Sequence, residues 1–316
     1  MELFKNKKIL IIGDVMLDSY LFGNVERISP EAPVPIVDIT NKQNKLGGAA
    51  NVATNIENLG GTSILCTIIG KDNNSDIFLS LLKKAGLTNS YILQTHNRIT
   101  TNKTRIIGNN HQMLRVDEEL KTELLLDDQY NFLCLVDDVF DHEKIDCVIF
   151  EDYDKGVLNK DVITTVINKA QELNIPILVD PKKKNFSHYK NITLFKPNLK
   201  EFKESIGSSL EEGSKILHEN GIKIVFVTLS ENGIFISYKK DNEIINKIIP
   251  GISREVVDVS GAGDTVISVV SMLINDIDIE EIAKISNIAG GIVCEEVGVV
   301  PIDITKLLKE YYENKY

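Results

Sequence analysis

The sequence predicts a three-layer α/β protein, in which helices cover both faces of a mostly parallel central β-sheet and a small second sheet forms a lid. Short runs rich in β-branched residues alternate with longer amphipathic segments, which is typical of strands and helices around a parallel sheet. Two segments, within about 15–40 and 90–116, break this order with alternating apolar residues. The chain after residue 260 has only helix-like patterns.

The elements of the main body follow from these runs in chain order. Strands are predicted at 8–13, 62–70, 145–150, 175–180, 192–197 and 222–229. Helices are predicted near 48–59, 74–85, 160–173, 198–206, 210–220, 262–275, 279–295 and 303–315. Because no internal repeat or low-complexity linker separates these units, we expect a single domain over residues 1–316.

The lid is predicted from the two interrupting segments. The first, DSYLFGNVERISPEAPVPIVDIT, contains three prolines, which suit short edge strands better than a crossover helix. In the second, THNRITTNKTRIIGNNHQMLR, apolar and polar residues alternate. A projecting sheet with apolar Val34, Ile36 and Val37 leaves an edge to be covered. We therefore expect a homodimer in which a second lid covers it.

Composition narrows the class of partner. The formal charge is −11 and the pI is near 5.1, which argues against nucleic acid or an anionic membrane and favours a small molecule. The four cysteines are far apart, a pattern that favours buried reduced thiols over disulfides. No stretch approaches about 20 apolar residues and no signal-peptide core precedes Gly13, so we expect a cytoplasmic protein.

The segment DVSGAGDTVISVV, residues 258–270, raises the main question about chemistry because it sets a glycine-rich turn directly before a carboxylate. If the chain turns sharply at Gly261, Ala262 and Gly263 and enters a helix, the first amide groups form an anion hole. Asp264 beside that hole can deprotonate a hydroxyl while the amides stabilise a transferring phosphoryl group. A glycine-rich loop with a capping aspartate is the alternative.

A second glycine-rich segment, KLGGAANVATNIENLGG, spans residues 45–61. The pair Gly47 and Gly48 allows the backbone to approach a ligand closely, and Asn51 can present an amide to sugar hydroxyls. A helix packed tightly against a sheet explains the same residues.

A third segment, FKPNLKEFKE, carries Asn198 and Glu201 on one side of a helix that starts after Pro197. This pair can hold a hydrated Mg²⁺ on a nucleotide triphosphate through water. A capping box, with Asn198 as N-cap and Glu201 at the third helical position, is the alternative.

Two further turns lie at ends of predicted strands. Thr228 and Ser230 in VTLSENGIFI can meet phosphates, unless the segment is a plain hairpin. Asp14 and Asp18 in GDVMLD follow the first strand, where open α/β sheets bind ligands, although solvated turn aspartates explain them too. A dinucleotide-dependent dehydrogenase is disfavoured, because this turn lacks a G-x-G-x-x-G pattern.

Taken together and in this order, the glycine pair, the PN-x-x-E segment, the TLSENG turn and the D-x-SGAGD segment resemble the ribokinase-like (PfkB-type) sugar kinases. The resemblance covers essentially the whole chain. It implies an α/β/α sandwich with a β-sheet lid, and phosphoryl transfer from MgATP to a sugar hydroxyl. A non-catalytic sugar or nucleotide sensor on the same fold is disfavoured, because Asp264 and the SGAGD segment are intact.

The resemblance is narrower in several segments. GDVMLDSYLFGNVERISPEAPVPIV, KLGGAANVATNIENLGG, MLRVDEE, EDYDKGVL and VDPKKKNF closely resemble the kinase module of D-glycero-D-manno-heptose 7-phosphate kinases of lipopolysaccharide precursor synthesis. That module is often fused to a nucleotidyltransferase domain, which we do not expect in this chain. We therefore expect phosphorylation of the anomeric hydroxyl without adenylylation, with another phosphosugar, such as fructose 6-phosphate, as the alternative substrate.

The resemblance also implies roles for individual residues. Asp264 corresponds to the general base, and the amides at 261–263 correspond to the anion hole. The implied ATP contacts are Asn198, Leu199, Lys200, Glu201, Thr228, Ser230, Gly233 and Asn287, with Asn198 and Glu201 also at the Mg²⁺ position. Ser230 stands where the wider family commonly has glycine. The implied sugar contacts are Asp14, Asp18, Gly47, Gly48 and Asn51. A requirement for a monovalent cation is left open.

The distal phosphate of such a substrate needs cations, because a dianion leaves water only when it is paired. The candidates are Arg105, Lys155 and Lys182, with Arg27 of the lid behind them. Lys183 and Lys184 are expected to be solvated.

Overall fold

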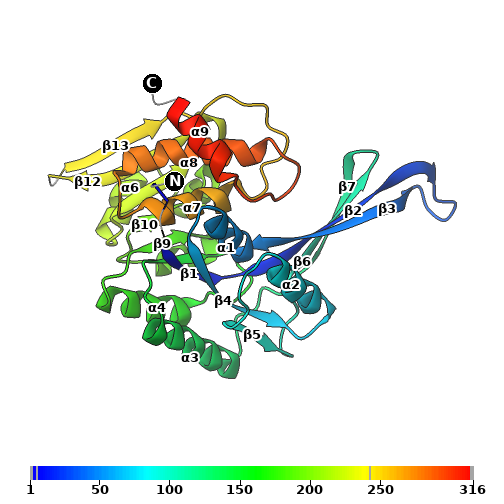
Figure 1. The fold of residues 1–316 in the computed structure, drawn as a ribbon, viewed down its shortest axis with the longest axis horizontal. Coiled ribbons are helices and arrows are strands. Elements are labelled where there is room, and N and C mark those ends of the chain that lie inside the picture. The colour runs from blue at the N-terminus through cyan, green and yellow to red at the C-terminus, as the bar shows by residue number, and fades with distance from the viewer. Residues whose placement is uncertain (1–2, 5, 242, 314–316) are drawn as a thin grey trace.

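The protein, described here by a computed structural model of residues 3–4, 6–241 and 243–313, has the predicted three-layer sandwich with a projecting sheet (Figure 1). The fold class is confirmed. Helices lie on both sides of a nine-stranded sheet in the order β13-β12-β11-β10-β9-β8-β1-β4-β5, and a separate four-stranded sheet has the order β3-β2-β6-β7.

Apolar runs form the central strands because both faces of the sheet are covered. In β1 (Lys8–Gly13), Ile9 and Ile11 join the core on one face, whereas Leu10 and Ile12 join the core on the other. The remaining parallel strands are β4 (Thr62–Gly70), β5 (Ile92–Thr95), β8 (Cys147–Glu151), β9 (Ile177–Asp180), β10 (Leu194–Phe195) and β11 (Ile224–Thr228). The antiparallel strands β12 (Ile234–Lys240) and β13 (Glu243–Ile249) extend one edge.

The helices divide between the two faces. One face is covered by α1 (Ala49–Asn58), α2 (Asn73–Lys84), α7 (Ala262–Leu273), α8 (Ile279–Cys294) and α9 (Ile304–Glu313). The other is covered by α3 (Leu126–His142), α4 (Lys160–Glu172), α5 (Leu199–Ile206) and α6 (Leu210–Glu219). Residues 314 and 315 of the helix predicted at 303–315 lie outside the described residues. Two short 3₁₀ helices span Lys183–His188 and Ser230–Asn232.

The lid consists of β2 (Val15–Ile28), β3 (Pro35–Gly48), β6 (Asn102–Gly108) and β7 (His111–Glu118), and it extends to one side of the body in Figure 1. The predicted limits need one correction. Residues 92–95, which were assigned to the lid, form β5 and pair with β4 in the central sheet. The segment is too short and too apolar to reveal from sequence which sheet it joins.

Some elements were not predicted. Helix α3 was missed, although Phe132, Val136 and Val139 form a buried stripe at helical spacing, because its acidic residues mask the pattern. Among the cysteines, Cys66 and Cys147 are buried but Cys134 is exposed. Within the described residues, no helix has the length and apolar character needed to cross a bilayer.

The topology places the site. Strand order runs outward from β1 in both directions, through β4 on one side and β8 on the other. Open parallel sheets bind ligands at the carboxyl ends of strands where the order reverses in this way. Asp14, Glu151, Asp180 and Lys196 all stand at or just after such strand ends.

Candidate active site

A cleft of about 770 Å³ opens at the carboxyl edge of the sheet, beside the N-terminus of α7. Nine residues proposed from the sequence line it, namely Asn198, Leu199, Lys200, Glu201, Thr228, Ser230, Gly261, Gly263 and Asp264. Other lining residues with polar side chains were not proposed for the nucleotide or catalytic groups, among them Tyr153, Asp180, Lys182 and Lys196. Of these, Lys182 was proposed as a substrate contact.

Asp264 is buried in the first turn of α7, and each of its carboxylate oxygens has a fixed donor. The side-chain amide of Asn51 donates to Oδ2 over 2.7 Å, and the hydroxyl of Tyr153 donates to Oδ1 over 2.7 Å. A carboxylate has about four acceptor positions, so each oxygen keeps one for a proton. The two donors therefore orient the carboxylate without occupying all of its acceptor positions.

The electrostatics of this carboxyl group suit a base. Burial raises the pKa of Asp264, and the hydrogen bonds from Asn51 and Tyr153 lower it only in part. Burial also raises the pKa of Tyr153 well above its ordinary value, so the phenol stays a neutral donor. A buried aspartate with a raised pKa takes up a proton more readily than a solvated one.

The glycine-rich turn before Asp264 has a geometric reason. Gly261 has φ of 82°, in the left-handed region, and a Cβ there would lie 2.8 Å from Nδ2 of Asn51. A side chain at 261 would therefore push away the amide that orients the base. The amide of Ala262 bonds to Val259 O over 3.3 Å, whereas among the described residues the amides of Gly261 and Gly263 have no backbone partner, and both glycines line the cleft.

Three buried carboxylates meet at the floor of the cleft. One oxygen each of Glu151, Asp180 and Asp264 lies within 4.8 Å of the other two. Lys196, also buried, pairs with Asp180 over 2.7 Å. Burial alone would lower the pKa of Lys196, but the charges of Asp180 and Glu151 and the hydrogen bond to Asp180 raise it.

Glu151 is the unusual member of this cluster. It is fully buried, and neither carboxylate oxygen has a hydrogen-bond partner within the described part of the chain. Burial, then the charges of Asp180 and Asp264, raise its pKa well above the ordinary value. Clustered carboxylate oxygens with free lone pairs are the ligands that hard divalent cations prefer, so this floor fits a magnesium ion.

Asn198 and Glu201 form the capping box that was the alternative interpretation of their spacing. The amide of Glu201 donates to the Asn198 side chain over 2.9 Å, and the amide of Asn198 donates to Glu201 Oε2 over 3.0 Å. The other oxygen of Glu201 pairs with Lys182. Both residues still border the cleft, but their side chains are engaged in local contacts.

The turn after β11 keeps a backbone shape that glycine usually provides. Ser230 has φ of 55°, so the serine adopts the left-handed conformation despite its side chain. Gly233 has φ of 93°, and a Cβ there would lie 2.1 Å from Ile249 O, so it serves contact with β13 rather than the cleft. The amide of Asn287 donates to Ile249 O and Pro250 O over 3.0 and 3.1 Å.

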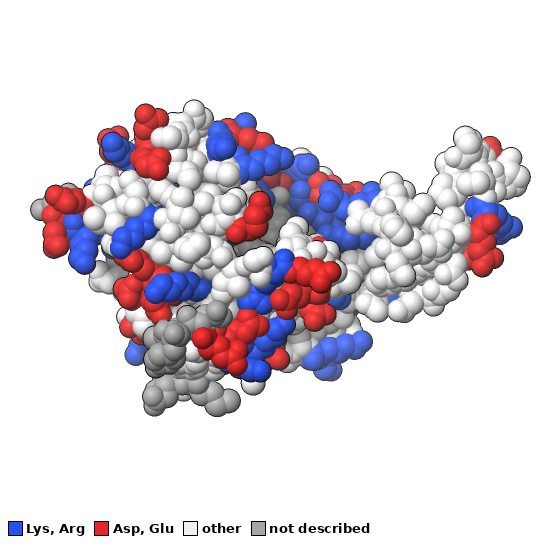
Figure 2. All heavy atoms as spheres, turned by 90° about the horizontal axis from the view of Figure 1, so that it is seen from above, with Lys and Arg blue, Asp and Glu red and all other residues white. Residues whose placement is uncertain are grey.

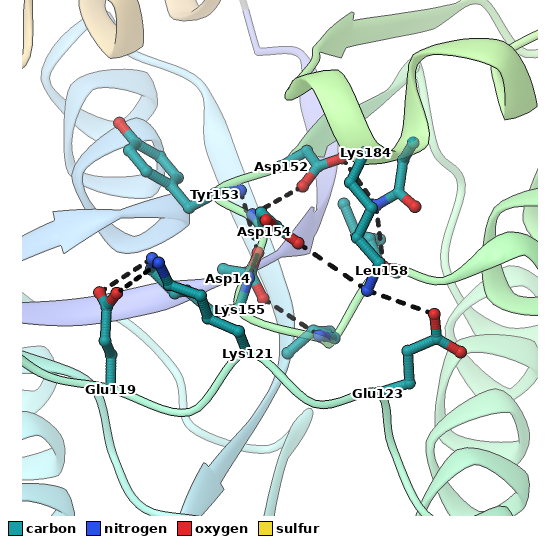
Figure 3. Close-up of polar contacts among 12 residues, drawn as sticks. Asp14, Glu119, Lys121, Glu123, Asp152, Tyr153, Asp154, Lys155, Leu158 and Lys184 are labelled. Atoms are coloured by element: carbon teal, nitrogen blue, oxygen red, sulfur yellow. Dashed lines mark hydrogen bonds and ion pairs between the residues drawn. The ribbon is translucent and has the colours of Figure 1, made fainter.

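Asp14 is buried and organises the loop after β8 (Figure 3). Its carboxylate accepts the backbone amides of Tyr153, Lys155 and Val157 at 2.9 to 3.1 Å. Burial still raises its pKa. In the structure this side chain fixes the segment that carries Tyr153, and contact with a sugar hydroxyl stays a prediction.

Asp18 on β2 forms an ion pair with Arg105 on β6. A Cβ on Gly47 would lie 2.2 Å from Asp18 Oδ2, and Gly48, with φ of 59°, would bring a Cβ to 2.5 Å from Asp14 O. The glycine pair therefore lets β3 pass close to both aspartates before α1 begins. The side-chain amide of Asn51 donates to Asp264, and contact of Asn51 with a sugar stays a prediction.

The remaining cations that were proposed for a distal phosphate have acidic partners or lie elsewhere. Lys155 pairs with Glu119 over 2.8 Å, and Figure 3 shows Lys121 reaching the same carboxylate. Arg27 is exposed on the far part of the lid. Lys183 is exposed, and Lys184, also exposed, lies 3.2 Å from Glu123.

Sequence reasoning missed Tyr153, Glu151, Asp180 and Lys196 as site residues. One signal was present for all four, since each stands at or within two residues of the carboxyl end of a predicted or observed parallel strand. Chain order gives no sign that these ends converge on Asp264.

The chain was compared with known sequences. The sequence model of the pfkB family of carbohydrate kinases matches residues 6–305. The chain is 39% identical over 300 residues to bifunctional protein HldE of Helicobacter pylori J99, covering 92% of this chain and 64% of that protein. It is 38% identical over 314 residues to bifunctional protein HldE of a Nitratiruptor species, covering 97% and 65%. The chain thus spans less than two thirds of these relatives.

Solved structures with low sequence identity share the fold. Phosphofructokinase-2 from Escherichia coli in complex with potassium matches with a TM-score of 0.79 at 19% identity, covering 98% of this chain and all of that one. A ribokinase from Arabidopsis thaliana complexed with ribose and ATP matches with a TM-score of 0.71 at 17% identity, covering 97% and 99%.

Proposed function

Because the chain belongs to the pfkB family of carbohydrate kinases, we propose that it transfers the γ-phosphoryl group of ATP to the anomeric 1-hydroxyl of D-glycero-D-manno-heptose 7-phosphate. The products are the 1,7-bisphosphate and ADP, at a step of ADP-heptose synthesis for lipopolysaccharide. The family supports the reaction class, and the relatives called bifunctional protein HldE support the heptose. The observation that carries the proposal is the doubly oriented Asp264 carboxylate at the head of α7.

The proton and phosphoryl steps follow from that geometry. Asp264 takes the proton of the 1-hydroxyl, the freed oxygen attacks the γ-phosphorus, and the bond to the β-phosphate oxygen of ATP breaks. Asn51 and Tyr153 keep the carboxylate in place while it gains the proton. Such a positioned base contributes about 10²- to 10⁴-fold to the rate.

Charge on the transferring group needs donors near the base. The amides of Gly261 and Gly263 and the dipole of α7 supply partial positive charge. Lys196 is close, since a Cβ on Gly263 would lie 3.5 Å from its Nζ. These groups stabilise the phosphoryl oxygens during transfer.

Magnesium fits the acidic floor of the cleft. Glu151 and Asp180 would hold it, because the Glu151 oxygens lack other partners among the described residues. The ion would neutralise charge on the triphosphate. Asn198 and Glu201 cap α5 with their side chains. We therefore propose that they contact the ion only through water, outside its direct ligands.

ADP release measured with a panel of sugars tests the function. We expect heptose 7-phosphate to give the highest kcat/KM, by about 100-fold or more over fructose 6-phosphate, and phosphorus NMR to place the new phosphate on carbon 1. A preference for fructose 6-phosphate would identify another phosphosugar kinase. ATP binding without ADP release on any sugar would favour a sensor and contradict the proposal.

The lid supports the proposed homodimer. Large apolar side chains of the lid are exposed, including Ile28, Val34, Met113, Leu114 and Val116. Exposed strand surfaces of this kind are usually covered. Light scattering at micromolar concentration should give twice the chain mass of 35.3 kDa, whereas a monomeric mass would contradict it.

A further inference from the structure

We infer that Lys45 and Lys103, two lysines on the inner face of the lid, bind the phosphate that the sugar already carries. This inference rests on the proposed function, because it assigns the anionic end of a sugar phosphate whose other end reacts at Asp264. Neither lysine is among the cations that were proposed from the sequence for this phosphate.

Strand register places the two lysines in one row. Lys45 on β3 and Lys103 on β6 both stand opposite Asp18 on β2. Residues opposite one another across neighbouring strands share a face of the sheet. Because adjacent strands are about 4.8 Å apart, the two backbones are separated by about 10 Å, and long side chains can converge on one anion between them.

Asp18 forms its ion pair with Arg105 of the next row rather than with either lysine. Lys155 and Lys182 also have carboxylate partners, Glu119 and Glu201. Within the described part of the chain, no ion pair involves Lys45 or Lys103. The two lysines therefore differ from the three cations first proposed, each of which is already paired.

Both ammonium groups rest on aromatic rings, one on β2 and one in the loop after β8. The Lys45 ammonium lies 5.5 Å from the centre of the Tyr20 ring and 3.3 Å from Val297 O. The Lys103 ammonium lies 5.7 Å from the centre of the Tyr153 ring. Cation–π contacts hold such groups at a defined place but leave their N–H donors free for an anion.

The electrostatic state of these lysines also favours an incoming anion. Burial lowers the pKa of Lys45, and it lowers the pKa of Lys103 with help from the charge of Lys155. The charges of surrounding carboxylates, Asp18 among them, offset this lowering of the pKa only in part, so a dianionic phosphate would add further opposite charge. Figure 2 shows Lys and Arg side chains along the hollow between the body and the lid.

The position of Lys103 relative to Asp264 fits a substrate with a single sugar ring. The Lys103 ammonium lies over the ring of Tyr153, and the hydroxyl of the same tyrosine donates a hydrogen bond to Asp264. The same ring therefore contacts the lysine on its face and the base through its hydroxyl. A pyranose spans a similar interval, with its reacting hydroxyl at one end and a terminal phosphate at the other.

The test compares Lys45→Met, Lys103→Met and the double variant with Lys42→Met. Lys42 is an exposed residue of the same strand whose register partner, Leu21, places it on the opposite face of the lid. ADP release is measured against heptose 7-phosphate, unphosphorylated heptose and ATP. We expect the KM for heptose 7-phosphate to rise about 10- to 100-fold for each lysine. The KM for the unphosphorylated sugar and for ATP should change less than about 2-fold.

An unchanged KM for heptose 7-phosphate in the double variant would overturn the inference while leaving the kinase proposal intact. An equal rise for both sugars would also overturn it, because it would show general damage to the lid. Calorimetric titration with heptose 7-phosphate in the absence of ATP separates binding from turnover. Binding by the wild type that is lost in the double variant supports the lysines even if no ADP is released. Equal binding by both proteins, or none by the wild type, overturns them.

Discussion

The side-chain amide of Asn51 lies 2.7 Å from Oδ2 of Asp264, across 213 positions of the chain, and joins the starts of α1 and α7. Asn55 supports this contact by donating to the backbone oxygen of Asn51 over 3.0 Å. The glycine at 261 leaves room for it. Two glycine-rich segments thus have a shared task, which is to orient one buried carboxylate.

Replacing Asn51 with alanine should reduce kcat more than it changes the KM for ATP. The loss of a donor to a buried carboxylate corresponds to about 10- to 100-fold in rate. Steady-state kinetics checks this, with Asn58→Ala at the exposed end of α1 as the matched control. A kcat within about 2-fold of wild type would show that Asn51 does not position the base.

Replacing Tyr153 with phenylalanine should move the acid limb of the pH–rate profile to higher pH. In the proposed mechanism the base is the ionised form of Asp264, and the Tyr153 hydrogen bond lowers the pKa of that carboxyl. Removing the donor raises the pKa further, so activity is lost sooner as pH falls. The measurement is kcat/KM against pH. A limb that stays in place or moves to lower pH would contradict the assigned contact.

Replacing Glu151 with glutamine should raise the Mg²⁺ concentration needed for half-maximal activity by about 10-fold or more. The carboxylate provides two unpartnered oxygens to the acidic floor, and an amide provides one weaker ligand. Titration of activity with Mg²⁺ at fixed ATP checks this, with Glu143→Gln far from the cleft as control. An unchanged Mg²⁺ requirement would remove Glu151 from the ion's ligands.

The same variant gives a stability test in metal-free protein. Folding raises the pKa of Glu151 through burial, so its ionisation destabilises the fold as pH rises above the unfolded value of about 4.3. Glutamine does not titrate. The free energy of unfolding of Glu151→Gln relative to wild type should therefore increase from pH 5 to pH 8. A difference that shrinks with pH would contradict the buried, unpaired state.

Much of the fold follows from local pattern. Apolar runs such as KILIIG become central strands, and cap residues such as Asp72 and Asn159 start the predicted helices. The edge strand at 92–95 and helix α3 were not assigned correctly, since partner choice depends on packing. The strand is too short, and the helix too rich in acidic residues, for the sequence pattern to show how each one packs.

The site was predicted only where one segment contains its chemistry. The SGAGD turn points to Asp264 as a candidate base, whereas Tyr153 and Glu151 become candidates only because β8 ends beside α7. The contact of Asn51 with Asp264 could not be predicted, because the two residues are remote in sequence, and its contact with a sugar stays a prediction. Asn198 is the opposite case, because its side-chain contacts are local: it forms the capping box of α5 with Glu201, three residues away.

Asp264→Asn tests the central claim most directly, when kcat and ATP binding are measured on the same protein beside Asp276→Asn as an exposed control. The account predicts a fall in kcat of about 10²- to 10⁴-fold with the dissociation constant for ATP unchanged. Near wild-type kcat in Asp264→Asn would contradict the assignment of this carboxylate as the base.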